Sequence, residues 1–298
     1  MDILKIGTRA SELAVWQAKK VQKELENYGI KSVIVPIVST GDQKLNQPIY
    51  KLGISGVFTK EIDIALINNK VDIAVHSLKD VPTILPEGIV QSAVLKRASE
   101  NDVLVLNNEN HDRNTIATGS LRRSSQWLNR YPNDSIVEIR GNVSRRIQKL
   151  KENKWSATIL AKAGLDRLNI FSKNYKILEW MVPAPGQGAI SIQNLNINKH
   201  ISSILQNINH TETELCTNIE REFLNKLEGG CSAPIGAIAK INKDHLLFKG
   251  VLLSLDGKEK IEIIEKISIE KLENSGKIFA EKILSMGGDK ILKNINNK

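Results

Sequence analysis

The sequence is poor in cysteine and has no long apolar segment. Two cysteines in 298 residues exclude a disulfide framework, a cysteine-rich zinc site and a ferredoxin-type iron–sulfur pattern. No run approaches the roughly 18 apolar residues of a transmembrane helix, so we expect no membrane partner. The first residues lack the basic-then-apolar layout of a signal peptide, and the cytoplasm is therefore the expected location.

Aromatic residues are also scarce, at 4%, whereas basic residues are in excess. Lysine and arginine total 42 against 33 acidic residues, which gives a net charge of +9. This excess suggests a polyanion or an acidic small molecule as the ligand. An RNA-binding protein is one alternative, but the few aromatic residues and the lack of an RNP-like or zinc-knuckle motif argue against nucleic acid.

The arginines are concentrated in one stretch of the chain. Eight of the eleven arginines lie between Arg113 and Arg167, whereas lysines are spread along the chain and accompany many asparagines and isoleucines. Arginine is a directed donor that binds carboxylates with two parallel hydrogen bonds. The arginine cluster therefore indicates a binding site, and we expect much of the lysine charge to lie on solvated surface.

The order of apolar segments predicts an α/β fold, and the length favours two or three domains. In the first unit we expect strands at residues 3–6, 32–38 and 71–75, and helices at 11–28 and 59–68. In the second we expect strands at 102–106, 115–117, 135–139 and 157–160, and helices at 121–130 and 143–153. Residues 181–191, rich in proline and glycine, suggest a hinge or a return crossing.

The remaining chain predicts a small α+β third domain. Thr211 and Glu214 fit a capping box ahead of a helix at residues 215–227. Strands are expected at residues 246–253 and 260–267, and a helix at 269–284.

Two strand-to-helix junctions have the composition of anion sites. Ser120 is a natural N-cap, and Arg122 and Arg123 follow it in the first turn of a helix. The next unit repeats the pattern with Arg140 before a helix that carries Arg145 and Arg146. Ligands of open α/β sheets bind at the carboxyl ends of strands, where both junctions fall. The alternative is a pair of solvated basic helix starts.

A third polar segment, at residues 76–82, directly follows an apolar strand. Asp80 could stabilise a cationic intermediate there, and Lys79 and Ser77 could bind an anionic substituent. The alternative is a surface turn with an Asp–Lys pair. His76 is better explained as a hydrogen-bonded strand-end residue, and no second histidine lies at ligand spacing, so we expect no metal.

The two cysteines are expected to differ. Cys216 shares a helix face with apolar residues and should be buried. Cys231 lies in a glycine-rich loop, where an exposed thiol suits covalent attachment, although an inert loop cysteine is the alternative. Residues 53–56 form a glycine loop that could be a lid, but it lacks P-loop spacing.

Taken together, these segments resemble the hydroxymethylbilane synthase (porphobilinogen deaminase) family. The motifs follow family order over about residues 3–240: IGTRASELAVWQA, FTKEIDIAL, DIAVHSLKDVP, GSLRR, RGNVSRR, ILAKAGLDRL, PAPGQGA and LEGGCSAPIG. The resemblance implies two periplasmic-binding-protein-like (type II) lobes that flank a cleft, and a small α+β domain that carries the cofactor cysteine loop. The implied domains are residues 1–95 with 189–207, residues 96–188, and residues 208–298.

The resemblance also implies an activity. A dipyrromethane cofactor, thioether-linked to Cys231, would prime the head-to-tail condensation of four porphobilinogen molecules, with release of ammonia, to give hydroxymethylbilane for heme biosynthesis. Small-molecule porphobilinogen would be the partner, and the enzyme a monomer. A non-catalytic two-lobed anion-binding module is the alternative, and it would need neither Cys231 nor Asp80.

The resemblance assigns roles to individual residues. Catalytic roles fall on Asp80, Arg9, Lys79 and Arg146. Cofactor binding falls on Cys231, Ser11, Lys79, Thr118, Ser120, Arg122 and Arg123. Substrate binding falls on Arg9, Gln17, Ser77, Arg140, Arg146, Arg167 and Gln187, and Lys51 and Phe58 belong to a mobile loop over the cleft.

Overall fold

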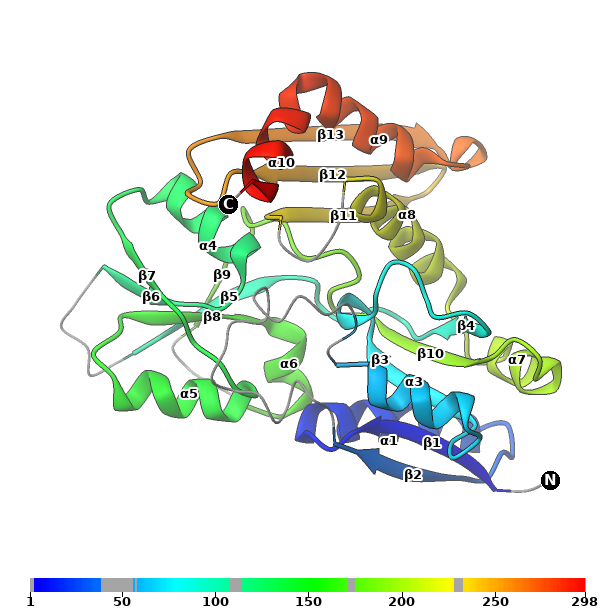
Figure 1. The fold of residues 1–298 in the computed structure, drawn as a ribbon. Helices are drawn as coiled ribbons and strands as arrows, with labels where there is room; N and C mark the ends of the chain where they lie inside the picture. The colour runs from blue at the N-terminus through cyan, green and yellow to red at the C-terminus, as the bar shows by residue number, and fades with distance from the viewer. Residues whose placement is uncertain are drawn as a thin grey trace.

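The chain folds around three β-sheets: the first two lie side by side, and the third, formed near the C-terminus, lies above both (Figure 1). The computed structural model describes residues 3–38, 56, 58–107, 114–170, 175–227 and 233–297. We call the first sheet with its helices the first lobe, the second sheet with its helices the second lobe, and the third sheet with its helices the third unit.

The first lobe contains a mixed five-stranded sheet. Its elements are β1 (Leu4–Arg9), α1 (Glu12–Glu26), β2 (Ser32–Ile37), α3 (Lys60–Ile67), β3 (Ile73–Ser77), β4 (Ile89–Val94), β10 (Ile190–Leu195) and α7 (Lys199–Gln206). The strand order is β2-β1-β3-β10-β4, with β10 antiparallel to both neighbours. Side chains alternate along β3, so Ile73 and Val75 pack with α1 and α7, whereas Ala74 packs with α3.

The second lobe repeats this topology. Its elements are β5 (Asp102–Leu106), β6 (Thr115–Ala117), α4 (Leu121–Arg130), β7 (Ser135–Val137), α5 (Val143–Glu152), β8 (Ala157–Ala161), α6 (Lys162–Arg167) and β9 (Tyr175–Ile177). The strand order is β7-β6-β8-β5-β9, and β5 runs antiparallel to both neighbours, as β10 does in the first lobe. Trp127 of α4 covers one face of the sheet, and Leu150 of α5 and Leu165 of α6 cover the other.

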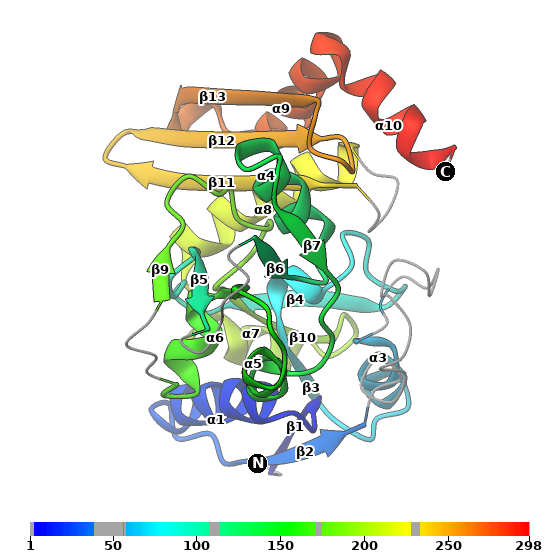
Figure 2. The same cartoon turned by 90° about the vertical axis from the view of Figure 1, so that its left-hand side faces the viewer.

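The chain passes between the lobes twice. Residues 95–101 lead from β4 into β5, and residues 178–189 lead from β9 back to β10. Each antiparallel strand is the first strand that the chain forms after a crossing, as the labels β5 and β10 in Figure 2 help to follow. The two crossings lie side by side, because the Ala98 N–H donates to the Gly188 carbonyl at 3.1 Å. The return strand β10 falls within the range 189–207 that the family resemblance implies for the first domain.

The third unit is an antiparallel meander covered by helices. Its elements are α8 (Thr211–Leu227), β11 (Ile235–Asn242), β12 (His245–Leu253), β13 (Lys260–Ser268), α9 (Ser275–Ile283) and α10 (Asp289–Asn296). Its core joins Phe223 of α8, Phe248 of β12 and Phe279 of α9, with ring centroids 5.1 and 4.6 Å apart in turn. Cys216 is 5% exposed in this core, so its predicted burial is confirmed, and burial raises its thiol pKa to about 11.

These elements confirm the predicted α/β class and correct two details of the third unit. The predicted helix at residues 269–284 is wrong at its start, because residues 269–271 form a 3₁₀ turn and the helix begins at Ser275. The predicted capping box is also wrong. The helix already includes Thr211, and the His210 Nδ1 atom accepts the backbone N–H of Thr213 (3.1 Å) instead.

Candidate active site

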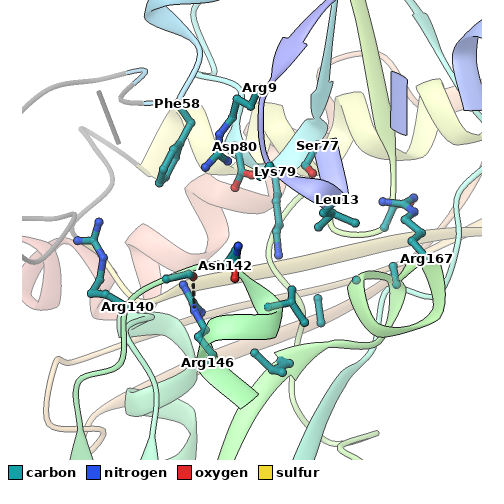
Figure 3. A pocket seen from close by; sticks show the side chains of 18 of the residues that line it. Arg9, Leu13, Phe58, Ser77, Lys79, Asp80, Arg140, Asn142, Arg146 and Arg167 are labelled. Atoms are coloured by element: carbon teal, nitrogen blue, oxygen red, sulfur yellow. Dashed lines mark hydrogen bonds between the residues drawn. The ribbon is translucent and has the colours of Figure 1, made fainter. Parts of the chain in front are cut away.

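A cavity of about 240 Å³ lies between the two lobes, and most of the predicted site residues line it (Figure 3). The wall combines the end of β1, the segment after β3, and the starts of α4, α5 and α6. The predicted residues that line it are Arg9, Ser11, Phe58, Ser77, Lys79, Asp80, Arg123, Arg140, Arg146 and Arg167.

Asp80 and Lys79 are presented by a short 3₁₀ turn, Leu78–Asp80, at the end of β3. Leu78 is fully buried, and its N–H donates to the Ala189 carbonyl at 3.1 Å, so the turn is anchored to the return crossing. Arg221 of α8 holds the segment that follows by donating to the carbonyls of Val81 (2.9 Å) and Pro82 (2.6 Å). The two side chains therefore face the cavity from a fixed backbone.

Lys79 is a perturbed lysine. Its ammonium donates to the Gln187 amide oxygen at 3.3 Å. Burial, and then the nearby Arg123 cation, lower the pKa of Lys79 to about 8. Bound carboxylates would oppose both effects, so an acidic ligand favours the charged form.

The first lobe also contributes Arg9, whose guanidinium carbon lies 4.2 Å from the centroid of the Phe58 ring. Beside them is a recess of about 50 Å³ that extends to Gln17 and His76. The Gln17 amide donates to the Ser77 hydroxyl at 2.8 Å, which fixes both polar groups at the recess. Burial, and then Arg9, lower the pKa of His76 to about 4, so this imidazole is neutral near pH 7.

The second lobe contributes arginines at the start of α5, facing Lys79 and Asp80 across the cavity (Figure 3). Asn142 caps the helix by accepting the Arg145 N–H at 2.8 Å. The Arg146 Nε atom donates to the Gly141 carbonyl at 2.8 Å, which bends the side chain back toward the cavity. Burial, then Arg123 and Arg140, lower the Arg146 pKa to about 10. Burial also lowers the pKa of Arg140.

Arg167 closes one end of the cavity. It is 8% exposed, donates to the Gly188 carbonyl at 2.6 Å, and lies 5.6 Å from the Trp16 ring centroid. Burial lowers its pKa to about 10. Because it comes from α6 and binds the return crossing, Arg167 joins the second lobe to the first.

Arg122 and Arg123 are not the free helix-start donors that the sequence suggested. Both are about nine-tenths buried, and both pair with Asp102, at 2.7 Å and 2.8 Å. Arg123 still lines the cavity, whereas Arg122 donates to the Val182 carbonyl (2.8 Å) behind the wall. Sequence reasoning missed Asp102, although an acidic residue at the start of the apolar run DVLVL needs a buried partner.

Other predicted residues lie behind the wall or outside the described ranges. Thr118 (3% exposed) and Gln187 (0% exposed) are buried, and within the described ranges neither these nor Ser120 line the cavity. Ser120 precedes α4 in an extended conformation, without a side-chain cap. Cys231 and Lys51 lie outside the described residues.

The described cavity wall is strongly cationic. Six cationic side chains reach it, against the single carboxylate of Asp80. Within the described ranges, no three histidine, cysteine or acidic side chains are grouped to hold a metal ion. The helices in the same ranges include none long and apolar enough to cross a membrane.

Two α/β lobes around a cavity whose described wall carries six cations and one carboxylate define a two-lobed protein suited to binding acidic small molecules. The chain belongs to the porphobilinogen deaminase family. A family model described as "Porphobilinogen deaminase, dipyromethane cofactor binding domain" matches residues 4–203, and the C-terminal domain model of that family matches residues 214–285. The resemblance read from the sequence motifs is therefore confirmed.

Two relatives with porphobilinogen deaminase in their names are similar to most of this chain. The porphobilinogen deaminase of Desulforamulus reducens is 38% identical over 97% of both chains. A probable porphobilinogen deaminase of Methanocaldococcus jannaschii is 44% identical over 83% of this chain and 86% of its own. Among solved structures, the VFT2 domain of Bordetella pertussis BvgS matches 69% of this chain and 86% of its own, with 13% identity and a TM-score of 0.43.

Proposed function

We propose that this chain is a hydroxymethylbilane synthase, a transferase that condenses four porphobilinogen molecules head to tail and releases ammonia. The observation that carries the proposal is the convergence of six cationic side chains and Asp80 on one cavity. Porphobilinogen carries an acetate and a propionate, so each ring adds two carboxylates to the growing chain. Arginines bind carboxylates in water-poor sites through paired hydrogen bonds, which matches this substrate class.

The residues present fit a dipyrromethane cofactor, because such a group is itself a polycarboxylate and the wall supplies cationic donors. When bound, the dipyrromethane supplies the primer to which substrate rings are added. We assign its attachment to Cys231, and its carboxylates to Lys79, Arg123 and Ser11. Arg122 acts indirectly, because it shares the Asp102 carboxylate with Arg123. Thr118 and Ser120, which precede both arginines at the same strand-to-helix junction, are assigned to the cofactor as well.

Asp80 has the catalytic role in this proposal. When the C–N bond of porphobilinogen breaks and ammonia leaves, positive charge develops on the pyrrole. A carboxylate that accepts the pyrrole N–H stabilises this charge, and its fixed backbone keeps it aligned throughout. The anchored turn Leu78–Asp80 provides this rigidity, and Arg9 and Lys79 beside it bind the carboxylates of the reacting ring.

The remaining wall residues are assigned to substrate binding. Gln17 and Ser77 offer neutral donors in the recess, and Arg140, Arg146 and Arg167 offer cations along the cavity. Gln187 acts indirectly, because it is buried and contacts Lys79. Phe58, together with Lys51, is assigned to a loop over the cavity.

We also propose the three domains at residues 1–95 with 189–207, 96–188 and 208–298, and a monomeric, cytoplasmic enzyme. The paired sheets support the first two domains, since β10 returns to the first lobe after β9. The separate core of the third sheet supports the last.

The cofactor assignment is tested by the intact mass of the purified protein. The mass should exceed that of the sequence by one covalent dipyrrole, and Cys231→Ser should abolish the increment, whereas the matched variant Cys216→Ser should keep it. An active preparation with the unmodified sequence mass would refute the attachment.

The role of Asp80 is tested by Asp80→Ala. We expect turnover to fall about 10²–10³-fold while the circular dichroism spectrum and the covalent mass stay unchanged, because the group acts on developing charge. Asp289→Ala, which removes an exposed carboxylate paired with Lys293 in the third unit, is the control and should be fully active. Wild-type turnover in Asp80→Ala would show that Asp80 has no catalytic role.

A further inference from the structure

Behind the cavity wall, one fully buried carboxylate organises three cations. Asp102, the first residue of β5, is 0% exposed. Its Oδ2 atom accepts from Arg122 at 2.7 Å, and its Oδ1 atom accepts from the Arg123 Nε atom at 3.0 Å. Oδ1 also accepts from the Gln187 amide at 3.0 Å. Lys79 is the third cation, because it donates to the oxygen of that same amide.

This cluster connects segments that are far apart in the sequence. Lys79 belongs to the first lobe, Arg123 and Asp102 to the second, and Gln187 to the return crossing. Gln187 has two further hydrogen bonds. Its side-chain amide also donates to the backbone carbonyl of Glu100 (2.7 Å), and its backbone carbonyl accepts from the Arg97 Nε atom (2.8 Å). The cluster therefore fixes the position of Lys79 relative to Arg123 across the cavity.

The charges in the cluster are unequal. One carboxylate faces three cations, and the two that line the cavity are Lys79 and Arg123. Arg122 does not reach the wall and directs its guanidinium to Asp102 and the Val182 carbonyl. Asp102 thus neutralises Arg122 behind the wall. The excess positive charge remains on Lys79 and Arg123, which line the cavity and can meet a ligand.

We propose that Asp102 is a positioning residue for the condensation reaction: with Gln187 as its link, it sets the placement and the charge of Lys79 and Arg123. This inference rests on the proposed function, because it concerns the same cavity. Asp102 is not among the described residues that line the cavity, so its effect reaches the substrate through the side chains of Lys79 and Arg123.

A consequence can be measured at Lys79. The charged groups that act on its ammonium are Arg123, Asp80, Asp102 and Arg122, and the two carboxylates favour the protonated form. Asp102→Asn removes one of these carboxylates and leaves both arginines. The pKa of Lys79, about 8 in the intact cluster, should then fall by about one unit.

The test compares Asp102→Asn and Asp102→Glu with the wild-type holoenzyme. NMR of protein with isotope-labelled lysine side chains follows the titration of Lys79, and Lys79→Met identifies its signal. We expect a lower Lys79 pKa in Asp102→Asn and a near wild-type value in Asp102→Glu, with the alkaline limb of kcat/KM for porphobilinogen shifted in the same direction. An unshifted Lys79 titration in folded Asp102→Asn would overturn the proposal.

Asp102→Asn leaves Arg122 without a counter-ion and could prevent folding, so a second variant tests the same link. Gln187→Met cuts the connection to Lys79 and keeps both arginine pairs. We expect KM for porphobilinogen to rise about tenfold with a smaller change in kcat, because a hydrogen bond to a charged group is lost. Unchanged KM in Gln187→Met would also refute the link.

Asn194→Leu is the matched control for Gln187→Met. Asn194 is another fully buried amide, and its partners, Ser92 and Ser202, lie within the first lobe. This control should lose stability without the KM effect. The wild-type enzyme separates the two proposals: if it forms no tetrapyrrole, the proposed function fails, whereas an active wild type with unaffected variants refutes only the role of Asp102.

Discussion

The buried carboxylate of Glu220 connects the third unit to the two crossings between the lobes, and its neutralisation should destabilise the protein strongly. Glu220 is 0% exposed on α8. One oxygen accepts from Arg97 Nη1 (2.6 Å) and the Ala239 N–H (2.9 Å). The other accepts from Arg97 Nη2 (3.1 Å) and the Gly186 N–H (2.8 Å). The perturbation that tests this arrangement is Glu220→Gln.

The magnitude follows from the geometry of the four hydrogen bonds. In either orientation of the new amide, its NH₂ group replaces an oxygen that accepted two donors, so two N–H groups lose their acceptor. The side chain of Arg97 is 12% exposed and loses its counter-ion. Removing one partner of a buried ion pair costs about 3–5 kcal/mol. We expect the lower part of this range, because Arg97 keeps its bond to the Gln187 carbonyl.

The assay is urea unfolding followed by circular dichroism, analysed as a double-mutant cycle with Arg97→Met. The combined variant should be more stable than the sum of the single effects predicts, because it contains no unpaired charge. Glu281→Gln, which breaks the exposed pair with Lys226, is the control and should change the free energy of unfolding by about 0.5 kcal/mol or less. A cost for Glu220→Gln as small as the control, or strict additivity in the cycle, would refute the reasoning.

Two further predictions concern stability. Burial lowers the pKa of His76 in the folded protein to about 4. Between that pH and the ordinary pKa of histidine, the unfolded chain binds more protons than the folded protein. The free energy of unfolding therefore falls as the pH drops through this range. From about pH 7.5 to about pH 4.5 the loss should be about 2.5 kcal/mol, and His76→Asn should lack that part of the urea-measured pH dependence; an equal dependence would contradict the assignment. Gly257 has φ +73°, and a Cβ there would overlap the Ser125 carbonyl oxygen, so Gly257→Ala should cost clearly more than Gly29→Ala, which has φ +74° and open space around it. Equal unfolding midpoints for the two variants would show that a Cβ at Gly257 does not meet the Ser125 carbonyl.

Local patterns were enough to predict much of the secondary structure. The strand at residues 102–106 and the helix at 121–130 coincide with β5 (Asp102–Leu106) and α4 (Leu121–Arg130). The strand β10 was not predicted, since its place between β3 and β4 depends on pairing with segments about a hundred residues earlier. Periodicity carries no information on such distant pairing, whereas it does report the buried face of a strand or helix.

For the site, the sequence indicated which cationic side chains lie close together, but not which of them are paired with a buried carboxylate. Arg122 and Arg146 occupy equivalent-looking positions near helix starts, yet one is paired with Asp102 behind the wall and the other lines the cavity. The difference depends on a carboxylate twenty residues upstream that enters through the antiparallel strand. A charged residue at the start of an apolar strand is the signal that could have revealed it.

The net charge of +9 therefore combines groups with different physical roles. In the cavity, burial lowers the pKa of Lys79 to about 8 and of Arg146 to about 10, and Arg123 adds repulsion to both. These cations are destabilised in the absence of a ligand, and a polycarboxylate would relieve the repulsion that the fold imposes on them. Donors held in place before binding need no reorganisation when charge arrives, which favours binding and catalysis together. Such a cavity requires buried anions such as Asp102 in its supporting layer, because without them the same repulsion would act against folding.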